Sequence, residues 1–337
     1  MNLRKFYGPV ISLAAVALLL LGTACSKADF HKTLRANRFQ PTQGGPILLA
    51  AYQPWFGRSG HINVGYSTQD RVVLARQIEQ AKNLGIQGFV VNWYGPHKTF
   101  EDRSYAMLQE QAASSAFNVA LMYDEDDSGE GSATQTTIDD LQYAYNQYIG
   151  PQSRIPNGPY LRYQGHPVIF IFPKGGRTDW NRVRQAVNGW QESPVLIYKD
   201  FNPTFADAFD GYFAWVQPGR GGWAKNGSNW GEDYLENFYT TMNSKYPDKI
   251  AVGAAWPGFN DSKASWSRNR LMDNRCGRTF EDSLRVFRRY YTDQHPLPFL
   301  MIVTWNDYEE GTAIERGYAS CKGESNVAKR ALPAAGQ

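Results

Sequence analysis

Two carboxylic acids, Asp307 and Glu310, stand three positions apart near the C-terminal end of the chain. Two neighbouring acids can divide the work of an acid and a base, because the charge of each raises the pKa of the other. Glycoside cleavage needs such a pair, since one carboxyl group protonates the leaving oxygen while the other acts as base or nucleophile. The spacing alone would also fit two solvated loop acids that cap a helix. The apolar segment before them, which ends in Trp305 and Asn306, favours a buried pair that faces a ligand.

Aromatic and polar side chains follow several other apolar segments of the chain. A sugar offers apolar C–H faces and many hydroxyl groups, so a sugar site combines aromatic faces with polar groups. Each aromatic residue taken singly is better explained as part of the core. Their recurrence at the ends of successive segments nevertheless predicts a substrate-binding site made of Tyr52, Trp55, Trp93, Tyr94, Asp124, Trp215, Gln217, Trp256 and Asn306.

Eight short apolar segments, rich in Val, Ile, Phe and Tyr, recur along the chain. They are apolar on both faces, which is typical of strands buried in a parallel sheet. Their ranges are 47–56, 88–95, 119–124, 167–173, 194–200, 211–217, 250–256 and 299–305. Helical periodicity lies between most of them, over 68–84, 100–115, 134–149, 178–191, 230–246 and 279–292. The connection 201–210 has room for a single turn only.

Strands that alternate with helices in this way predict a single-domain α/β protein, a (β/α)₈ TIM barrel over residues 45–320. The alternative is a doubly wound open sheet. The segment after the first strand, Tyr52–Trp55, lacks the glycine-rich fingerprint that a dinucleotide-binding sheet would carry. The chain after Gly311 is short, so we expect an eighth helix that is short or absent. The C-terminal ends of barrel strands build the active site, and the residues named above stand there.

The segment from Thr304 to Glu315, TWNDYEEGTAIE, resembles the eighth-strand motif of glycoside hydrolase families 99 and 71. Three more segments agree in order along the chain: AYQPWFG at 51–57, GFVVNWYG at 88–95 and WPGF at 256–259. The resemblance covers roughly residues 47–316. Family 99 contains endo-α-mannosidases and family 71 contains endo-α-1,3-glucanases. The resemblance therefore implies a TIM barrel that hydrolyses an α-linked glycan.

Family 99 implies a retaining mechanism that passes through a 1,2-anhydro sugar. Carried over by position, Asp307 is the base that acts on the 2-hydroxyl group, and Glu310 is the general acid that later activates water. This chain has aspartate where family 99 has glutamate, and its Asp-Tyr-x-Glu pattern is closer to family 71. A carboxylate one methylene shorter lies on the order of 1 Å further back, enough to impair a near-attack geometry unless the strand moves. The resemblance does not choose between mannan and α-1,3-glucan.

Two other classes of function stay open at this point. A catalytically silent relative could bind glycan at the same aromatic rim as a surface lipoprotein, and the aspartate at position 307 keeps that alternative open. A purely structural envelope protein would leave the aromatic strand ends unexplained. We expect an endo-acting glycoside hydrolase that works as a monomer, with an oligo- or polysaccharide substrate and no metal or organic cofactor.

The charges and the cysteines limit the partners. With 35 basic and 32 acidic residues and no basic run in the mature part, nucleic acid binding has little support. No cysteine spacing predicts zinc, and the acidic segment 124–135 has Gln135 where a calcium loop has its bidentate glutamate. Cys276 and Cys321 are candidates for a disulfide in an oxidising compartment, with two buried reduced thiols as the alternative.

The first residues predict export. Basic residues precede an apolar run, Val10–Leu21, which is too short for a permanent membrane span and is followed by small residues. The segment 21–26, LGTACS, resembles a bacterial lipoprotein box with Cys25 as the acylated residue, although Gly22 replaces the usual leucine. Ser26 after the cysteine resembles outer-membrane sorting; cleavage nearby without acylation is the alternative. We expect an envelope lipoprotein with a signal peptide at 1–25, a tether at 26–44 and a polar tail at 321–337.

Cys25→Ser tests the anchor. The variant lacks the thiol that would carry the lipid, so most of the protein should move from the membrane fraction to the soluble fraction. Cell fractionation followed by immunoblotting measures the distribution. Cys321→Ser serves as the matched control and should fractionate like the unchanged protein. Retention of Cys25→Ser in the membrane fraction would contradict acylation at this residue.

Overall fold

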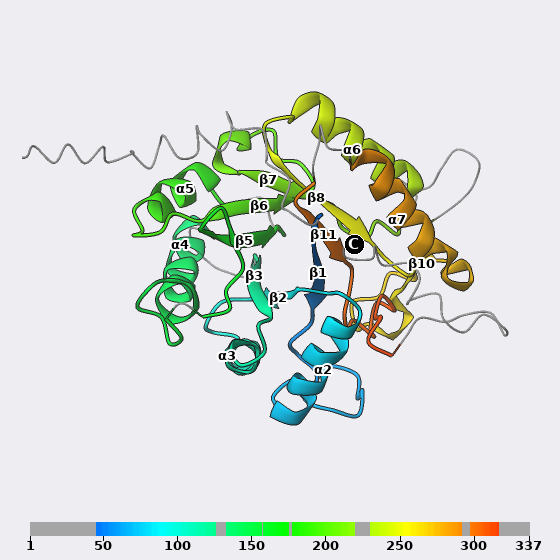
Figure 1. The fold of residues 1–337 in the computed structure, drawn as a ribbon, viewed down its shortest axis with the longest axis horizontal. Helices are drawn as coiled ribbons and strands as arrows, with labels where there is room; N and C mark the ends of the chain where they lie inside the picture. The colour runs from blue at the N-terminus through cyan, green and yellow to red at the C-terminus, as the bar shows by residue number, and fades with distance from the viewer. Residues whose placement is uncertain are drawn as a thin grey trace, which may run out of the picture.

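The structure, a computed structural model, describes residues 45–125, 133–156, 158–174, 177–219, 230–291 and 297–316. Eight parallel strands form a closed ring, seen end-on in Figure 1. They are β1 (Ile47–Tyr52), β2 (Gly88–Trp93), β3 (Asn118–Asp124), β5 (His166–Phe172), β6 (Val195–Lys199), β7 (Gly211–Phe213), β8 (Ile250–Ala255) and β11 (Phe299–Ile302). The predicted TIM barrel is confirmed, and each strand falls at or within one residue of a predicted apolar segment.

Hydrogen bonding runs around the whole ring. β1 pairs with β2 on one side and with β11 on the other, and β3 pairs directly with β5. Leu49 of β1, for example, lies opposite both Gly88 and Met301. Because the ring closes, none of these eight strands is left as an edge with unpaired backbone groups. Both faces of the strands are covered, which explains why β2 and β8 are buried along their whole length.

In the described part of the chain six α-helices surround the barrel, and all six were expected from helical periodicity (Figure 1). Asp70 caps α2 (Arg71–Asn83) and Asp179 caps α5 (Trp180–Asn188), each by accepting two backbone N–H groups of the first turn. Between β6 and β7 the chain forms only the 3₁₀ turn Ala206–Ala208, as the short connection predicts. The helices are α2 (Arg71–Asn83), α3 (Thr99–Ala113), α4 (Ala133–Ala144), α5 (Trp180–Asn188), α6 (Glu232–Lys245) and α7 (Arg278–Tyr290), with a π-helical turn, Tyr145–Ile149, directly after α4.

Helix α7 packs directly on the barrel at Gly253 of β8. A Cβ atom at this position would lie 2.3 Å from Cδ2 of Phe287 and 2.7 Å from the hydroxyl oxygen of Tyr239. Only a residue without a side chain therefore leaves room for the rings of α6 and α7. No helix among the described residues is both long and apolar enough to cross a membrane.

Two short pairings extend the barrel. β4 (Arg162–Tyr163) runs antiparallel to β5. Between β8 and α7, strands β9 (Phe259–Asn260) and β10 (Leu271–Met272) form a second, two-stranded antiparallel sheet. We call residues 259–272 the β9–β10 hairpin. Cys276, just beyond it, is disulfide-bonded. The pairing with Cys321 stays a prediction, because Cys25 and Cys321 both lie outside the described residues.

Residues 303–316, the described chain after β11, contain no helix. A hydrogen-bonded cluster fastens this segment to the start of the barrel instead. The carboxylate of Glu315 accepts hydrogen bonds from Gln77 Nε2, Tyr66 OH and Tyr308 OH, each at 2.8 Å. Gln77 in turn accepts a hydrogen bond from Tyr52 OH. One carboxylate thus joins α2, the β1–α2 loop and the segment after β11.

Glu315→Ala should destabilise the protein by about 2 kcal/mol, because three hydrogen-bond donors lose their shared acceptor. Urea unfolding followed by circular dichroism measures the change. Glu79→Ala, which truncates an exposed residue of α2, is the matched control and should stay within about 0.5 kcal/mol of the unchanged protein. Equal stability of the two variants would show that the cluster does not hold this segment.

Candidate active site

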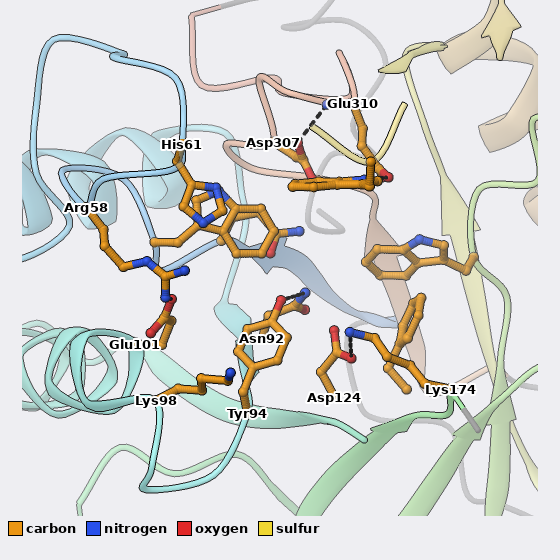
Figure 2. A pocket seen from close by; sticks show the side chains of 15 residues that line it. Arg58, His61, Asn92, Tyr94, Lys98, Glu101, Asp124, Lys174, Asp307 and Glu310 are labelled. Carbon is orange, nitrogen blue, oxygen red and sulfur yellow. Dashed lines mark hydrogen bonds and ion pairs between the residues drawn. The ribbon is translucent and has the colours of Figure 1, made fainter. Parts of the chain in front are cut away.

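A cavity of about 470 Å³ opens at the C-terminal ends of the strands (Figure 2). Its floor is formed by residues at the ends of β1, β2, β3, β5 and β11, and its walls come from the longer loops. Both predicted carboxylates line it. The full lining is Gln53, Trp55, Arg58, His61, Asn92, Tyr94, Lys98, Glu101, Asp124, Phe172, Lys174, Trp215, Trp266, Asp307 and Glu310.

Asp307 is buried and organises its own loop. Its Oδ1 accepts hydrogen bonds from the backbone N–H groups of Glu309 at 3.1 Å and Glu310 at 2.8 Å. Its own N–H donates to Thr304 Oγ1 at 2.8 Å, and Thr304 lies 3.0 Å from the hydroxyl of Thr312. These bonds fold the chain back on itself directly after β11. Within the described part of the chain these hydrogen bonds engage Oδ1, which leaves Oδ2 for the cavity.

Glu310 approaches the cavity from the other end of the same loop. Its Oε1 accepts a hydrogen bond from the indole N–H of Trp266 at 3.1 Å and lies 3.9 Å from the Arg270 guanidinium. Its backbone carbonyl accepts a hydrogen bond from Asn260 at 2.7 Å. The side chain is 19% exposed, so it still reaches solvent or a ligand.

Burial raises the pKa of both carboxyl groups. The pKa of Asp307 lies well above its usual range because the group is buried, and the charge of Glu310 raises it further. Burial also raises the pKa of Glu310, although the Trp266 hydrogen bond and the Arg270 charge oppose the increase. The pair therefore keeps a proton to a higher pH than an isolated carboxyl group would, which suits shared acid and base work.

Aromatic rings form two walls of the cavity. Trp55 stacks on His61 with ring centroids 5.0 Å apart and an angle of 13° between the planes. The edge of Trp266 packs against Trp55, with the centroids 6.1 Å apart. Phe172 and Trp215, which also line the cavity, meet edge to face with their ring centroids 5.3 Å apart. Flat apolar surfaces on two sides of paired acids match the C–H faces of a sugar ring.

Several buried polar atoms of the lining have no hydrogen-bond partner within the described part of the chain. They are Gln53 Oε1, Trp55 Nε1, Asn92 Oδ1 and Glu101 Oε2. An unpaired buried donor or acceptor costs about 1–3 kcal/mol, so such atoms cluster where a ligand or water completes them. The set contains both donors and acceptors, which is what a ligand rich in hydroxyl groups would satisfy.

Asp124 lines the same cavity, at the end of β3 (Figure 2). Its carboxylate forms an ion pair with Lys174 at 2.7 Å. Burial raises the pKa of Asp124 to about 6, although the Lys174 ammonium group lowers it in part. Lys174 also lies over the ring of Tyr94, 5.3 Å from its centroid.

A second cavity of about 170 Å³ adjoins the first. Glu310, Trp215 and Phe172 line both cavities, whereas Asp307 lines only the larger one. The lining of the smaller cavity is more polar, with Lys199, Asp200, Gln217, Tyr234 and Arg270. Glu310 therefore stands at the junction of two spaces.

Comparison with known proteins identifies the family. The model of glycosyl hydrolase family 71 matches residues 62–325, which is most of the chain. The chain belongs to glycosyl hydrolase family 71. It is therefore a glycoside hydrolase, and its substrate is a carbohydrate. Among the curated proteins no match is found.

Solved structures share the barrel. The GH99 endo-α-mannosidase from Bacteroides thetaiotaomicron, in complex with bis-tris propane, aligns with a TM-score of 0.63 at 15% identity, over 84% of this chain and 93% of that chain. A second structure of a GH99 endo-α-mannosidase from the same organism gives 0.62 at 16% identity, over 85% and 95%. A glycoside hydrolase-like protein gives 0.57 at 15% identity, over 82% and 88%. At these identities the likeness shows the fold.

In this family 71 barrel, part of the predicted site comes together. The predicted residues that line the larger cavity are Trp55, Tyr94, Asp124, Trp215, Asp307 and Glu310. Gln217 lines the smaller cavity instead. Asn306 lines neither cavity; its side chain accepts a hydrogen bond from the Gln53 N–H and donates one to the Gln53 carbonyl, at 2.7 and 2.9 Å. It thereby joins the ends of β1 and β11.

Three predicted substrate contacts lie in the core instead. Trp93 is fully buried and donates its indole N–H to Asp102 of α3. Trp256 donates to the carbonyl of Trp230, and Tyr52 donates to Gln77 of α2. Side chains alternate between the two faces of a strand, so a neighbour of each aromatic residue faces the other way. At β2 the cavity is therefore lined by Asn92 rather than by Trp93.

The rest of the lining was not predicted as part of the site, and several of these residues come from loops. Arg58 forms an ion pair with Glu101 in the first turn of α3. His61 hydrogen-bonds to the buried carboxylate of Glu309 at 2.9 Å, which holds the β1–α2 loop over the cavity. Trp266 comes from the β9–β10 hairpin. Neither periodicity nor a motif marks these positions, because loops carry no regular side-chain pattern.

Trp55→Ala should weaken oligosaccharide binding at least about tenfold, because it removes a ring face and an unpaired indole N–H from the lining. Isothermal titration in an Asp307→Asn background measures binding without turnover. Trp190→Phe is the matched control, since Trp190 stacks on Tyr145 and lines neither cavity. Equal loss of affinity in both variants would indicate a general effect on folding.

Proposed function

We propose that this family 71 enzyme is an endo-acting hydrolase of an α-linked glycan, of the α-mannan or α-1,3-glucan type, with Asp307 and Glu310 as its catalytic pair. The observation that carries the proposal is the placement of both acids on one cavity between aromatic walls and unpaired polar atoms. The similar GH99 structures are named as endo-α-mannosidases, which supports an α-linked substrate. The segment 304–315, which resembles the eighth-strand motif of families 99 and 71, supports the same linkage.

In the first step, Asp307 takes the proton of the sugar's 2-hydroxyl group. The 2-oxygen then forms a bond to the anomeric carbon as the bond from that carbon to the leaving oxygen breaks. Glu310 donates its proton to the leaving oxygen, so the released chain carries a hydroxyl group. The product of this step is a 1,2-anhydro sugar. Burial, which raises the pKa of Asp307, makes its carboxylate a stronger base toward a hydroxyl group.

In the second step, the same groups reverse their roles. Glu310, now ionised, takes a proton from water, and the water oxygen attacks the anomeric carbon. The bond from that carbon to the 2-oxygen breaks, and Asp307 returns the proton to the 2-oxygen. Two displacements at one carbon give overall retention of configuration. The raised pKa of Glu310 supports its protonated form at the start of the cycle.

Endo action is supported by the adjoining cavities. Glu310, which would protonate the leaving oxygen, lies where the two cavities meet. Asp307, which would act on the sugar that is attacked, lines only the larger cavity. A glycan that crosses this junction would have sugars on both sides of the cleaved bond. The larger cavity then holds the sugar whose anomeric carbon is attacked, and the smaller cavity holds the sugar of the chain that is released.

For the cellular site, we propose an exported protein that is lipid-anchored through Cys25 in the cell envelope, at the outer membrane. The proposal rests on the first residues of the sequence. The tether 26–44 would then place the barrel away from the membrane surface, where a polysaccharide can reach the cavity.

Product analysis tests the substrate. Protein lacking residues 1–25 is incubated with α-mannan, α-1,3-glucan and a control β-glucan, beside Asp307→Asn and Glu310→Gln. Release of oligosaccharides of several lengths from one α-glycan, lost in both variants, is the expected result. Release from the β-glucan would contradict the proposed linkage. Binding without release would indicate a glycan-binding protein, and Asp307→Glu would then be the first variant to assay for activity.

Glu310→Gln should reduce kcat/KM about 10²–10⁴-fold on glycans, whose leaving group needs a proton. The loss should be far smaller on aryl glycosides with an activated leaving group, where protonation matters less. Steady-state kinetics on both substrates measure the ratio. Glu309→Gln is the matched control: Glu309 is bound to His61 and does not line the cavity, so it should affect both substrates alike. Equal losses in Glu310→Gln would contradict its role as the acid.

A further inference from the structure

The β9–β10 hairpin reaches the loop that carries the two acids. The backbone N–H of Asn260 donates to the carbonyl of Glu310 at 2.7 Å, which ties the start of the hairpin to the acid's own residue. From there the hairpin extends beside the larger cavity, and its Trp266 becomes part of the lining. The hairpin is therefore in contact with both the backbone and the side chain of Glu310.

Trp266 is half exposed, at 40%, although it is one of the largest apolar side chains. Its ring edge packs against Trp55 and His61, with centroid distances of 6.1 and 6.2 Å. This packing aims its indole N–H at Glu310 Oε1, 3.1 Å away. With Oε1 occupied by this donor, Oε2 remains the oxygen that can give or take a proton.

A buried carboxylate, Asp261, gives the hairpin a fixed shape. It accepts hydrogen bonds from the N–H groups of Arg268 and Arg270, from Arg270 Nε and from Ser267 Oγ, at 2.8 to 3.1 Å. Burial alone would raise the pKa of Asp261, but these hydrogen bonds hold it below its usual range, so the group stays ionised. Asp261 thereby directs the Arg270 side chain, whose Nη2 lies 3.9 Å from Glu310 Oε1.

We propose that the β9–β10 hairpin, through the indole N–H of Trp266 and the guanidinium group of Arg270, is a positioning device for Glu310 that fixes its Oε1 and favours its ionised form. Trp266 is the main positioning residue, because it makes the direct hydrogen bond. The consequence for the reaction rests on the proposed role of Glu310 as acid and base. The same donor that fixes the carboxyl group stabilises the carboxylate that remains after the proton has left.

Other charged and titratable groups also face Glu310 and set the background against which Trp266 acts. Negative charges raise the pKa of Glu310 and positive charges lower it, so a change at Trp266 must be measured with these groups intact. From the acid loop, the hairpin, the end of β6 and α6 they are Asp307, Glu309, Asp261, Arg270, Lys199, Asp200 and Tyr234.

Trp266→Phe keeps a ring against Trp55 and His61 but removes the N–H. The carboxylate of Glu310 loses a donor that favoured it, so its titration midpoint should rise by about one pH unit. Carbon-13 NMR of full-length protein labelled at the glutamate carboxyl carbons measures the midpoint, with Glu310 assigned by its missing signal in Glu310→Gln. Trp190→Phe, which removes an indole N–H donated to Gln142, is the matched control and should leave the midpoint unchanged.

Kinetics supply the second readout, on whichever of α-mannan and α-1,3-glucan the unchanged protein cleaves. An acid must be protonated to act, so activity falls as the pH rises past its pKa. A higher pKa in Trp266→Phe should therefore move the alkaline limb of kcat/KM to higher pH by the same amount. KM should stay within about twofold, because the ring that lines the cavity is retained.

Two outcomes would overturn the proposal: an unchanged Glu310 midpoint in Trp266→Phe, or an unmoved alkaline limb with a large rise in KM, which would make Trp266 a substrate platform only. The proposed function fails separately, if Glu310→Gln retains full activity or no glycan is cleaved. The NMR titration needs no turnover, so it tests the positioning by Trp266 in either case.

Discussion

The loop after β11 is folded around the side chain of Asp307, whose Oδ1 accepts the N–H groups of Glu309 and Glu310. A buried carboxylate is costly unless hydrogen bonds compensate for the lost water, and two backbone donors do so here. The same bonds turn the chain so that Glu310 faces the cavity while Glu309 faces His61. One side chain thus determines the direction of its two acidic neighbours. The hydroxyl pair of Thr304 and Thr312 closes the base of this turn.

Part of the charge around the larger cavity is matched in pairs. Arg58 pairs with Glu101, Lys174 with Asp124, and His61 contacts Glu309. Matched charges give a lining with strong local dipoles and little net field, which favours a neutral ligand with many hydroxyl groups over a strongly ionic one. The unpaired atoms of Gln53, Trp55 and Asn92 add both donors and acceptors to the same space. This balance is what an uncharged polysaccharide needs.

The barrel could be predicted from the sequence because parallel strands that are buried on both faces appear as short, nearly continuous apolar segments. The pair Asp307 and Glu310 was accessible for the same reason, since both stand directly after such a strand. The direction in which a single side chain points could not be predicted from the sequence. Trp93 and Asn92 are neighbours at the end of β2, and which of them faces the cavity depends on a register shift of one residue. Arg58, His61 and Trp266 belong to loops, where tertiary contacts such as His61 with Glu309 decide the geometry.

The short connection between β6 and β7, which forms a 3₁₀ turn in place of a helix, accounts for some of the aromatic residues of the chain. The connection that holds the 3₁₀ turn Ala206–Ala208 also carries Phe201, whose ring stacks on Phe238 at 5.3 Å and on Tyr246 at 5.5 Å, and meets Tyr212 at 5.4 Å. At this side of the barrel, aromatic side chains cover the strands where a longer connection would cover them with a helix. Part of the 14% aromatic content therefore packs the fold and does not belong to the substrate site. A relative with a full helix at this crossover would need fewer aromatic rings here, with no change in the glycans that it cleaves.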